Sequence, residues 1–148
     1  MSWRTIKDQA DINYLMEAFG YFHDSCLKEM KYTSGTYVDE ELRMQPTNNS
    51  RTLHVIFQHQ YNDPTAIELE FSELIELKLY PVNPYYTAEI IDATLMLNDS
   101  SVCWYDCGTL PEGELDQYKG TLIRAGMVRW RTADEYIGET DVFCRRGI

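Results

Sequence analysis

Basic residues are scarce in this sequence. The chain has 13 Lys and Arg against 24 Asp and Glu, which gives a formal charge of −11 and a pI near 4.6. Nucleic-acid backbones and anionic membrane surfaces repel a protein with this charge. The composition therefore argues against nucleic-acid and membrane binding, and among macromolecular partners it favours a basic protein surface.

Long apolar runs are missing as well. No stretch approaches the roughly 18 apolar residues of a membrane span, and residues 1–8 lack the apolar core of a signal peptide. We therefore expect a cytoplasmic protein with no membrane span. The four cysteines include no C-x-x-C pair, so we expect reduced, mostly buried thiols and no zinc site at Cys26, Cys103, Cys107 or Cys144.

The sequence also lacks the common catalytic signatures. It contains no phosphate-binding G-x-x-x-x-G-K-[ST] loop, no G-x-G-x-x-G after a strand, no H-E-x-x-H and no G-x-S-x-G elbow. Catalytic residues can still come together from distant strands, so an enzyme is not excluded. On the motifs alone we expect no catalytic residues, no bound metal and no cofactor.

The chain has the size and composition of one folded domain. Its 148 residues are 44% hydrophobic and 25% charged, which suffices for a core without disulfides, and we predict a single domain over residues 1–148. A helix is predicted over Asp8–Phe19, because apolar residues recur there at helical spacing and Gly20 follows as a stop.

Alternation of apolar and polar residues predicts strands after the helix. The predicted strands are Cys26–Thr33, Thr36–Met44, Arg51–Gln60, Ala66–Tyr80, Glu89–Leu97, Val102–Cys107 and Thr121–Thr132. A straight strand over Ala66–Tyr80 would extend about 50 Å at ~3.3 Å per residue, so we expect a bend or hairpin near Ser72–Glu73.

The last predicted strand, Thr121–Thr132, changes the side that faces inward. Its apolar residues have odd numbers up to Ala125 and even numbers from Val128, which a bulge at Gly126 would explain. The connections between strands are too short for helical crossovers. The predicted fold class is therefore α+β, with the N-terminal helix packed on a curved, mainly antiparallel β-sheet.

Histidine and aspartate are adjacent at the exit from the predicted helix. His23 and Asp24 could orient an imidazole, hold a metal or cap a turn. Adjacent strand residues point to opposite faces, so we interpret this pair as a polar junction and not as a dyad. His54 and His59 also leave opposite faces of one strand, which argues against a shared metal ion. The alternative is a small metal-dependent hydrolase centred on His23, Asp24 and His54.

Two surface features suggest protein binding. Tyr85 and Tyr86 lie in a loop stiffened by prolines, where tyrosines can serve as contact anchors. Glu68 and Glu70 alternate with apolar residues, and we interpret them as solvated carboxylates on the outer face of a strand. We therefore predict Tyr85 and Tyr86 as anchors and Glu68 and Glu70 as charges that guide a basic partner.

Three elements together resemble a known group of proteins. The Phe22-His23-Asp24-Ser25 element, the strand Cys26–Met30 and the strand Ile67–Ser72 occur in the order found in a group of small bacterial domains, some of which are assigned as immunity proteins of polymorphic toxin systems. The resemblance covers roughly Phe22–Leu79 and does not include the N-terminal helix or the arginine-bearing last strand. It implies a β-rich body and a binding role, and it supplies no catalytic residues.

The leading hypothesis is therefore a small acidic cytoplasmic protein-binding module, immunity-like, that occludes a basic partner protein. The metal-dependent hydrolase is the first alternative. A self-associating structural subunit, and hence a homo-oligomer, is the second.

Overall fold

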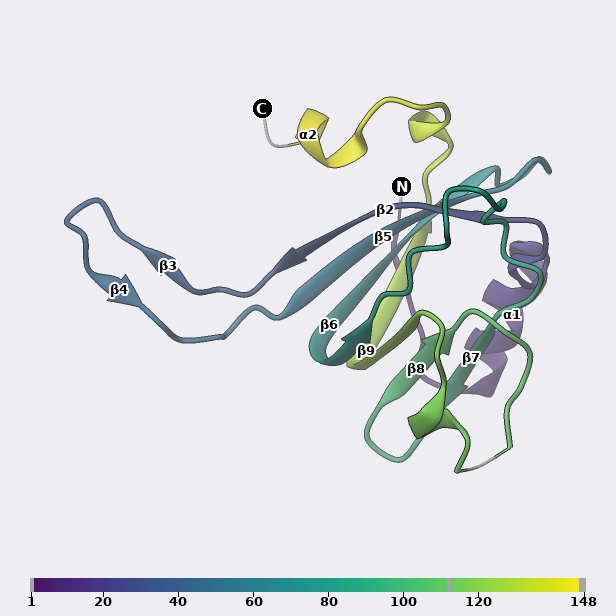
Figure 1. The fold of residues 1–148 in the computed structure, drawn as a ribbon, viewed down its shortest axis with the longest axis horizontal. Helices are drawn as coiled ribbons and strands as arrows, with labels where there is room; N and C mark the ends of the chain where they lie inside the picture. Colours follow the sequence, from purple (N-terminus) through teal and green to yellow (C-terminus); the bar gives the residue numbers. More distant parts are fainter. Residues whose placement is uncertain (1, 112, 147–148) are drawn as a thin grey trace.

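The computed structural model describes residues 2–111 and 113–146. Within them, seven strands form one antiparallel sheet in the order β2-β5-β6-β9-β8-β7, with β1 paired to β9 (Figure 1). The strands are β1 (Arg4–Thr5), β2 (Cys26–Thr33), β5 (Thr52–Gln58), β6 (Ala66–Lys78), β7 (Thr94–Leu97), β8 (Val102–Tyr105) and β9 (Leu122–Thr132). The predicted α+β class with a mainly antiparallel sheet is confirmed.

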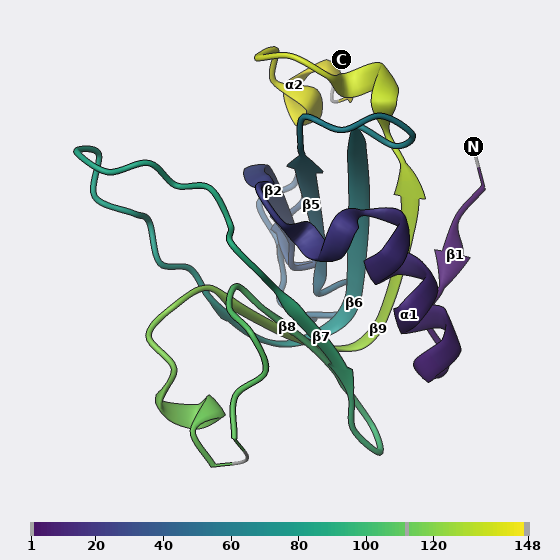
Figure 2. The same cartoon turned by 90° about the vertical axis from the view of Figure 1, so that its right-hand side faces the viewer.

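The main helix, α1 (Gln9–Ala18), packs its apolar stripe against the sheet (Figure 2). Asp8 caps it by accepting a hydrogen bond from the Asp11 N–H at 2.9 Å. Ile12, Leu15 and Met16 are buried in one core with side chains of β5, β6 and β9. The spacing of these apolar residues in the sequence is what places the helix on this face. Neither α1 nor α2 (Val142–Arg146) is long and apolar enough to span a membrane, nor is any other helix in the described ranges.

Strands β6 and β9 change their facing order at the same point. Ala125 and Val128 are both buried, so the predicted change of facing order in β9 is confirmed. The register shift, however, lies in β6 just after Leu74, while Glu73 has a φ of 54° and lies against Gly126. The predicted bend in β6 is therefore present, but the strand continues through it and forms no hairpin.

The prediction of one strand over Thr36–Met44 is wrong. Its acidic centre forms a turn between β3 (Tyr37–Val38) and β4 (Met44–Gln45), in which Asp39 accepts hydrogen bonds from the N–H groups of Glu41 and Arg43, each at 2.9 Å. Residues 36–49, here called the arm, project away from the main sheet (Figure 1). The arm carries apolar side chains that are more than half exposed: Tyr37, Val38, Leu42 and Met44.

Candidate functional site

Glu68 and Glu70 are not the solvated carboxylates that strand alternation predicts. Glu68 is 0% exposed; it accepts a hydrogen bond from Arg131 Nε at 2.8 Å and lies 2.8 Å from His54 Nδ1. Glu70 accepts two hydrogen bonds from Arg129, at 2.8 and 3.1 Å. The prediction fails because the β6–β9 register places Arg131 opposite Glu68 and Arg129 opposite Glu70.

Segments from both ends of the chain cover this charged row. The guanidinium of Arg129 lies 4.4 Å from the centre of the Trp3 ring, and Arg131 makes a second ion pair with Glu135 at 2.8 Å. Trp3 and Phe143 both contact the His54 ring, at centroid distances of 6.5 and 6.2 Å. Hydrogen bonding to Glu70 raises the pKa of Arg129 above its usual range. The row is thus a charge-compensated part of the structure, in which both carboxylates pair with arginines of β9.

His23 and Asp24 do meet, contrary to the expectation that they point to opposite faces. His23 Nε2 lies 3.3 Å from Asp24 Oδ2, and His23 Nδ1 donates to the Ile91 carbonyl at 2.7 Å. The expectation fails because the two residues precede β2 in a turn, where Asp24 has a φ of 55°. Both side chains are about half exposed.

His54 is remote from this pair. Cys26, at the start of β2, pairs with Gln58 of β5, and His54 lies four residues further along that strand. Four strand residues correspond to about 13 Å. No group of three or more His, Cys, Asp and Glu side chains within residues 2–111 and 113–146 is placed to hold a metal ion. The residues of the hydrolase alternative are therefore divided between two regions.

The cysteines are only partly as predicted. All four are free thiols. Cys26 and Cys144 are exposed to solvent and Cys107 is partly buried, so the expectation of mostly buried thiols is wrong. Cys103 is buried in a small second apolar cluster with Tyr105 and Leu122, and burial raises the pKa of its thiol.

A strongly acidic segment was missed by reasoning from the net charge. Residues 79–118 contain seven Asp and Glu and no Lys, Arg or His, so they carry seven of the eleven net negative charges. Within the described residues, this segment forms a loop (residues 80–93), the β7–β8 hairpin and the start of a second loop (106–121). Both loops project from the same side of the molecule (Figure 2). Counting charge by segment, instead of over the whole chain, would have found this acidic face.

The loop before β7 presents aromatic and acidic side chains together. Tyr85 and Tyr86 are 91% and 74% exposed, as their predicted role as anchors requires. The prediction of a strand from Glu89 fails, because β7 begins only at Thr94 and a single bridge between Ser25 and Ile90 precedes it. The Thr87 hydroxyl donates to Glu89 at 3.0 Å and holds the pKa of that carboxyl below its usual value, so Glu89 is negatively charged at neutral pH.

Two cavities flank this loop, and Glu89 lines both. One, of about 550 Å³, is bounded by the start of β2, the end of β5 and residues 137–138; we call it the His59 cavity. The other, of about 350 Å³, separates the loop from residues 106–108 and is also lined by Asp92 and Asp106. Both cavities are therefore lined by Ala88 and Glu89, close in sequence to the exposed tyrosines.

Comparison with known proteins gives no match: no family model, no curated protein and no solved structure is similar to this chain. The function must therefore be inferred from the chain's own chemistry.

Proposed function

We propose that the protein is a cytoplasmic binding module that occludes a basic protein surface with the acidic face formed by residues 79–118. The observation that carries this proposal is the uncompensated charge of that segment beside two exposed tyrosines. A surface of one charge sign attracts an oppositely charged partner and accelerates its association. The resemblance to immunity proteins favours a toxin as the partner.

The parts of the loop have different roles in this proposal. Tyr85 and Tyr86 are the anchors, because tyrosine combines a large apolar area with a hydroxyl and is frequent among residues that dominate binding. Glu89 and Asp92 are exposed and replace Glu68 and Glu70 as the guiding charges. Their position next to the tyrosines directs a basic surface onto the anchors.

The test is titration calorimetry with the product of a neighbouring toxin-like reading frame, at low and at high salt. Replacing both tyrosines (Y85A/Y86A) is expected to weaken binding by about 30-fold or more, which corresponds to the ~2 kcal/mol of a dominant contact. E89Q/D92N is expected to weaken binding at low salt and to reduce the salt dependence of the Kd. The matched control E40Q/E41Q also removes two negative charges, but from the arm. It should change neither the affinity nor its salt dependence. Absence of binding, or an equal effect of the control, would overturn the proposal.

A second candidate function, self-association, is favoured by the arm. We propose a second copy of this chain as its occupant, because the apolar side chains of the arm are exposed, and Arg43, which pairs with Asp39 at 3.1 Å and Glu41 at 3.0 Å, reduces the net charge of the tip from −3 to −2. An isolated two-stranded ladder is only marginally stable in water, so burial of its exposed apolar side chains against a partner would stabilise it. Light scattering from micromolar to submillimolar concentration tests this. A monomer throughout, or a dimer unchanged in L42S/M44S, would contradict it.

A further inference from the structure

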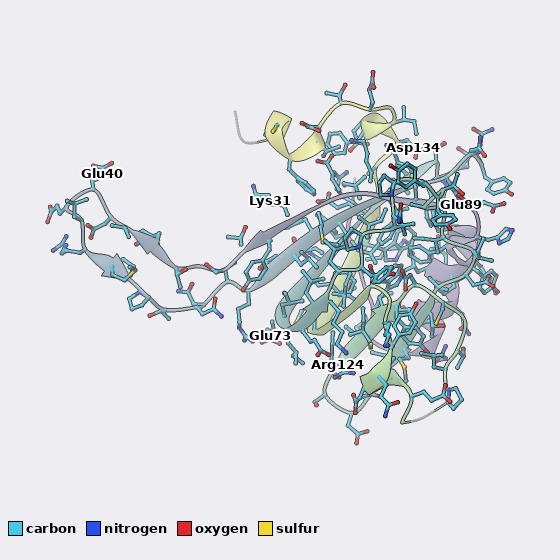
Figure 3. All side chains as sticks on the ribbon, viewed as in Figure 1. Lys31, Glu40, Glu73, Glu89, Arg124 and Asp134 are labelled. Atoms are coloured by element: carbon cyan, nitrogen blue, oxygen red, sulfur yellow. The ribbon has the colours of Figure 1, made fainter. Side chains whose placement is uncertain are left out.

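The His59 cavity combines apolar walls with negative charge. Ala88 and Ile137 contribute apolar lining, and Asp24 and Glu89 contribute carboxylates from two different segments. Glu89 lies at the end of the molecule opposite the arm tip, which is marked by Glu40 (Figure 3). Because Ala88 and Glu89 belong to residues 79–118, the cavity borders the acidic face, and a partner docked on that face would lie next to it.

The histidine that lines this cavity has one ring nitrogen without a hydrogen-bond partner in the described part of the chain. His59 is only 7% exposed, and its Nε2 lies 2.7 Å from the Pro64 carbonyl oxygen. A carbonyl can only accept, so Nε2 carries the hydrogen and Nδ1 of the neutral ring is an acceptor. Nδ1 is buried and has no hydrogen-bond partner in the described part of the chain. Buried acceptors are normally satisfied, so this one indicates a donor supplied from outside the chain.

Two donors on the cavity wall are engaged within the chain. The Ser25 hydroxyl donates to the Phe22 carbonyl at 2.6 Å, and the Gln58 amide donates to the carbonyls of Tyr136 and Gly138 at 3.0 and 3.2 Å. The lining of the cavity thus combines two carboxylates and an imidazole with apolar side chains. Its chemistry fits a ligand that is cationic, rich in donors and partly apolar.

We propose that the His59 cavity receives an arginine side chain of the basic partner. The guanidinium has five donors in a planar fork and is more weakly hydrated than an ammonium group, so it suits several acceptors in a partly apolar cavity better than lysine does. Its methylene stem would lie along Ala88 and Ile137, and its head would bind Asp24 and Glu89. The inference rests on the proposed function, for which it names the anchoring group of the partner.

The direct test uses the intact protein and a small probe. N-acetyl-arginine methylamide is titrated while backbone amides and the imidazole nitrogens of His59 are followed by NMR. We expect saturable shifts around the cavity and a change at His59 Nδ1. The lysine analogue should bind several-fold more weakly, and the uncharged citrulline analogue should show no saturation. No saturable shift with the arginine probe, or equal binding of citrulline, would overturn the proposal.

Charge-matched variants assign the binding to this cavity. E89Q and D24N should each weaken probe binding by about tenfold, the loss of one charge-assisted contact, whereas D116N on the same acidic face should leave it unchanged. Equal weakening by D116N would show non-specific attraction and contradict the proposal. If the probe fails while the toxin-like partner still binds through Tyr85 and Tyr86, only the arginine cavity is refuted. If the probe saturates and the partner does not bind, only the proposed function is refuted.

Discussion

Replacing Glu68 with alanine tests whether the charged row on the sheet is structural. Glu68 is 0% exposed, and its partner Arg131 has a side chain that is 10% exposed. The substitution leaves the guanidinium and the His54 ring without the carboxylate that both contact. Removing one partner of a buried ion pair costs about 3–5 kcal/mol, because the remaining charge stays desolvated. Glu135, which still pairs with Arg131, is 40% exposed and compensates only part of that charge. A solvated carboxylate, as the alternation alone predicts, would cost well under about 1 kcal/mol.

Urea unfolding followed by circular dichroism measures this difference. With a slope of about 2 kcal/mol per molar urea for a chain of this size, the midpoint of E68A should fall by roughly 1.5–2.5 M. The melting temperature should fall by about 6–20 °C. E70A is the matched control on the same strand: its pair is more accessible, with Glu70 17% and Arg129 41% exposed, and the expected cost is about 1 kcal/mol or less.

A double variant separates the ion pair from the packing around it. E68M/R131M removes both charges and keeps similar side-chain volume, so it should recover most of the stability that E68A loses. Two results would refute the assignment of Glu68 to a buried, charge-compensated position. One is a loss of unfolding free energy in E68A below about 1 kcal/mol, and the other is a double variant that is less stable than E68A.

Three further predictions follow from single positions. In the native protein the buried thiol of Cys103 should react with a thiol reagent far more slowly than the exposed thiol of Cys26, and equal rates would contradict the described burial. Backbone hydrogen bonds lower the pKa of Asp39 below its usual value of 3.8. The arm turn should therefore be intact above pH 3.8 and should open as the pH falls through the lowered pKa of Asp39. Amide chemical shifts of the arm measure this opening, and D39N should lose the pH dependence. Gly126→Ala places a Cβ 3.0 Å from the Glu73 Cβ and should cost about 1–3 kcal/mol in urea unfolding, with partial recovery in E73G/G126A.

Local periodicity predicted the elements whose neighbours are close in the sequence. Strand β2 has the predicted bounds, Cys26–Thr33, and α1 lies within the predicted Asp8–Phe19. Periodicity is informative there because burial repeats at the period of each element. It failed at Thr36–Met44, where Asp39 stabilises a turn by hydrogen bonds to the backbone, a preference that alternation does not measure.

Burial of the strand glutamates depends on residues about 60 positions away. Alternation places Glu68 and Glu70 on one face of β6, and it correctly separates that face from the main core. It does not show that Arg131 and Arg129 pair with them from β9, or that Trp3 lies over the row. The sequence did contain a signal of this pairing, because the two glutamates are two residues apart on β6 and the two arginines are two residues apart on β9. Using it requires the strand pairing, which the sequence alone did not supply.

The distribution of basic residues explains why one acidic region is structural and another is available for binding. All 13 Lys and Arg lie outside residues 79–118, so the rest of the chain has a net charge of only −4, from 17 acidic and 13 basic residues. Arg129, Arg131 and Arg124 neutralise carboxylates within the sheet, while the loop that carries Glu89 contains no basic residue. Charge changes on the sheet should therefore alter stability, and charge changes on the loop should alter partner binding with little effect on unfolding. Each set of variants is the control for the other, and loop variants that destabilise the fold as much as E68A would contradict this division.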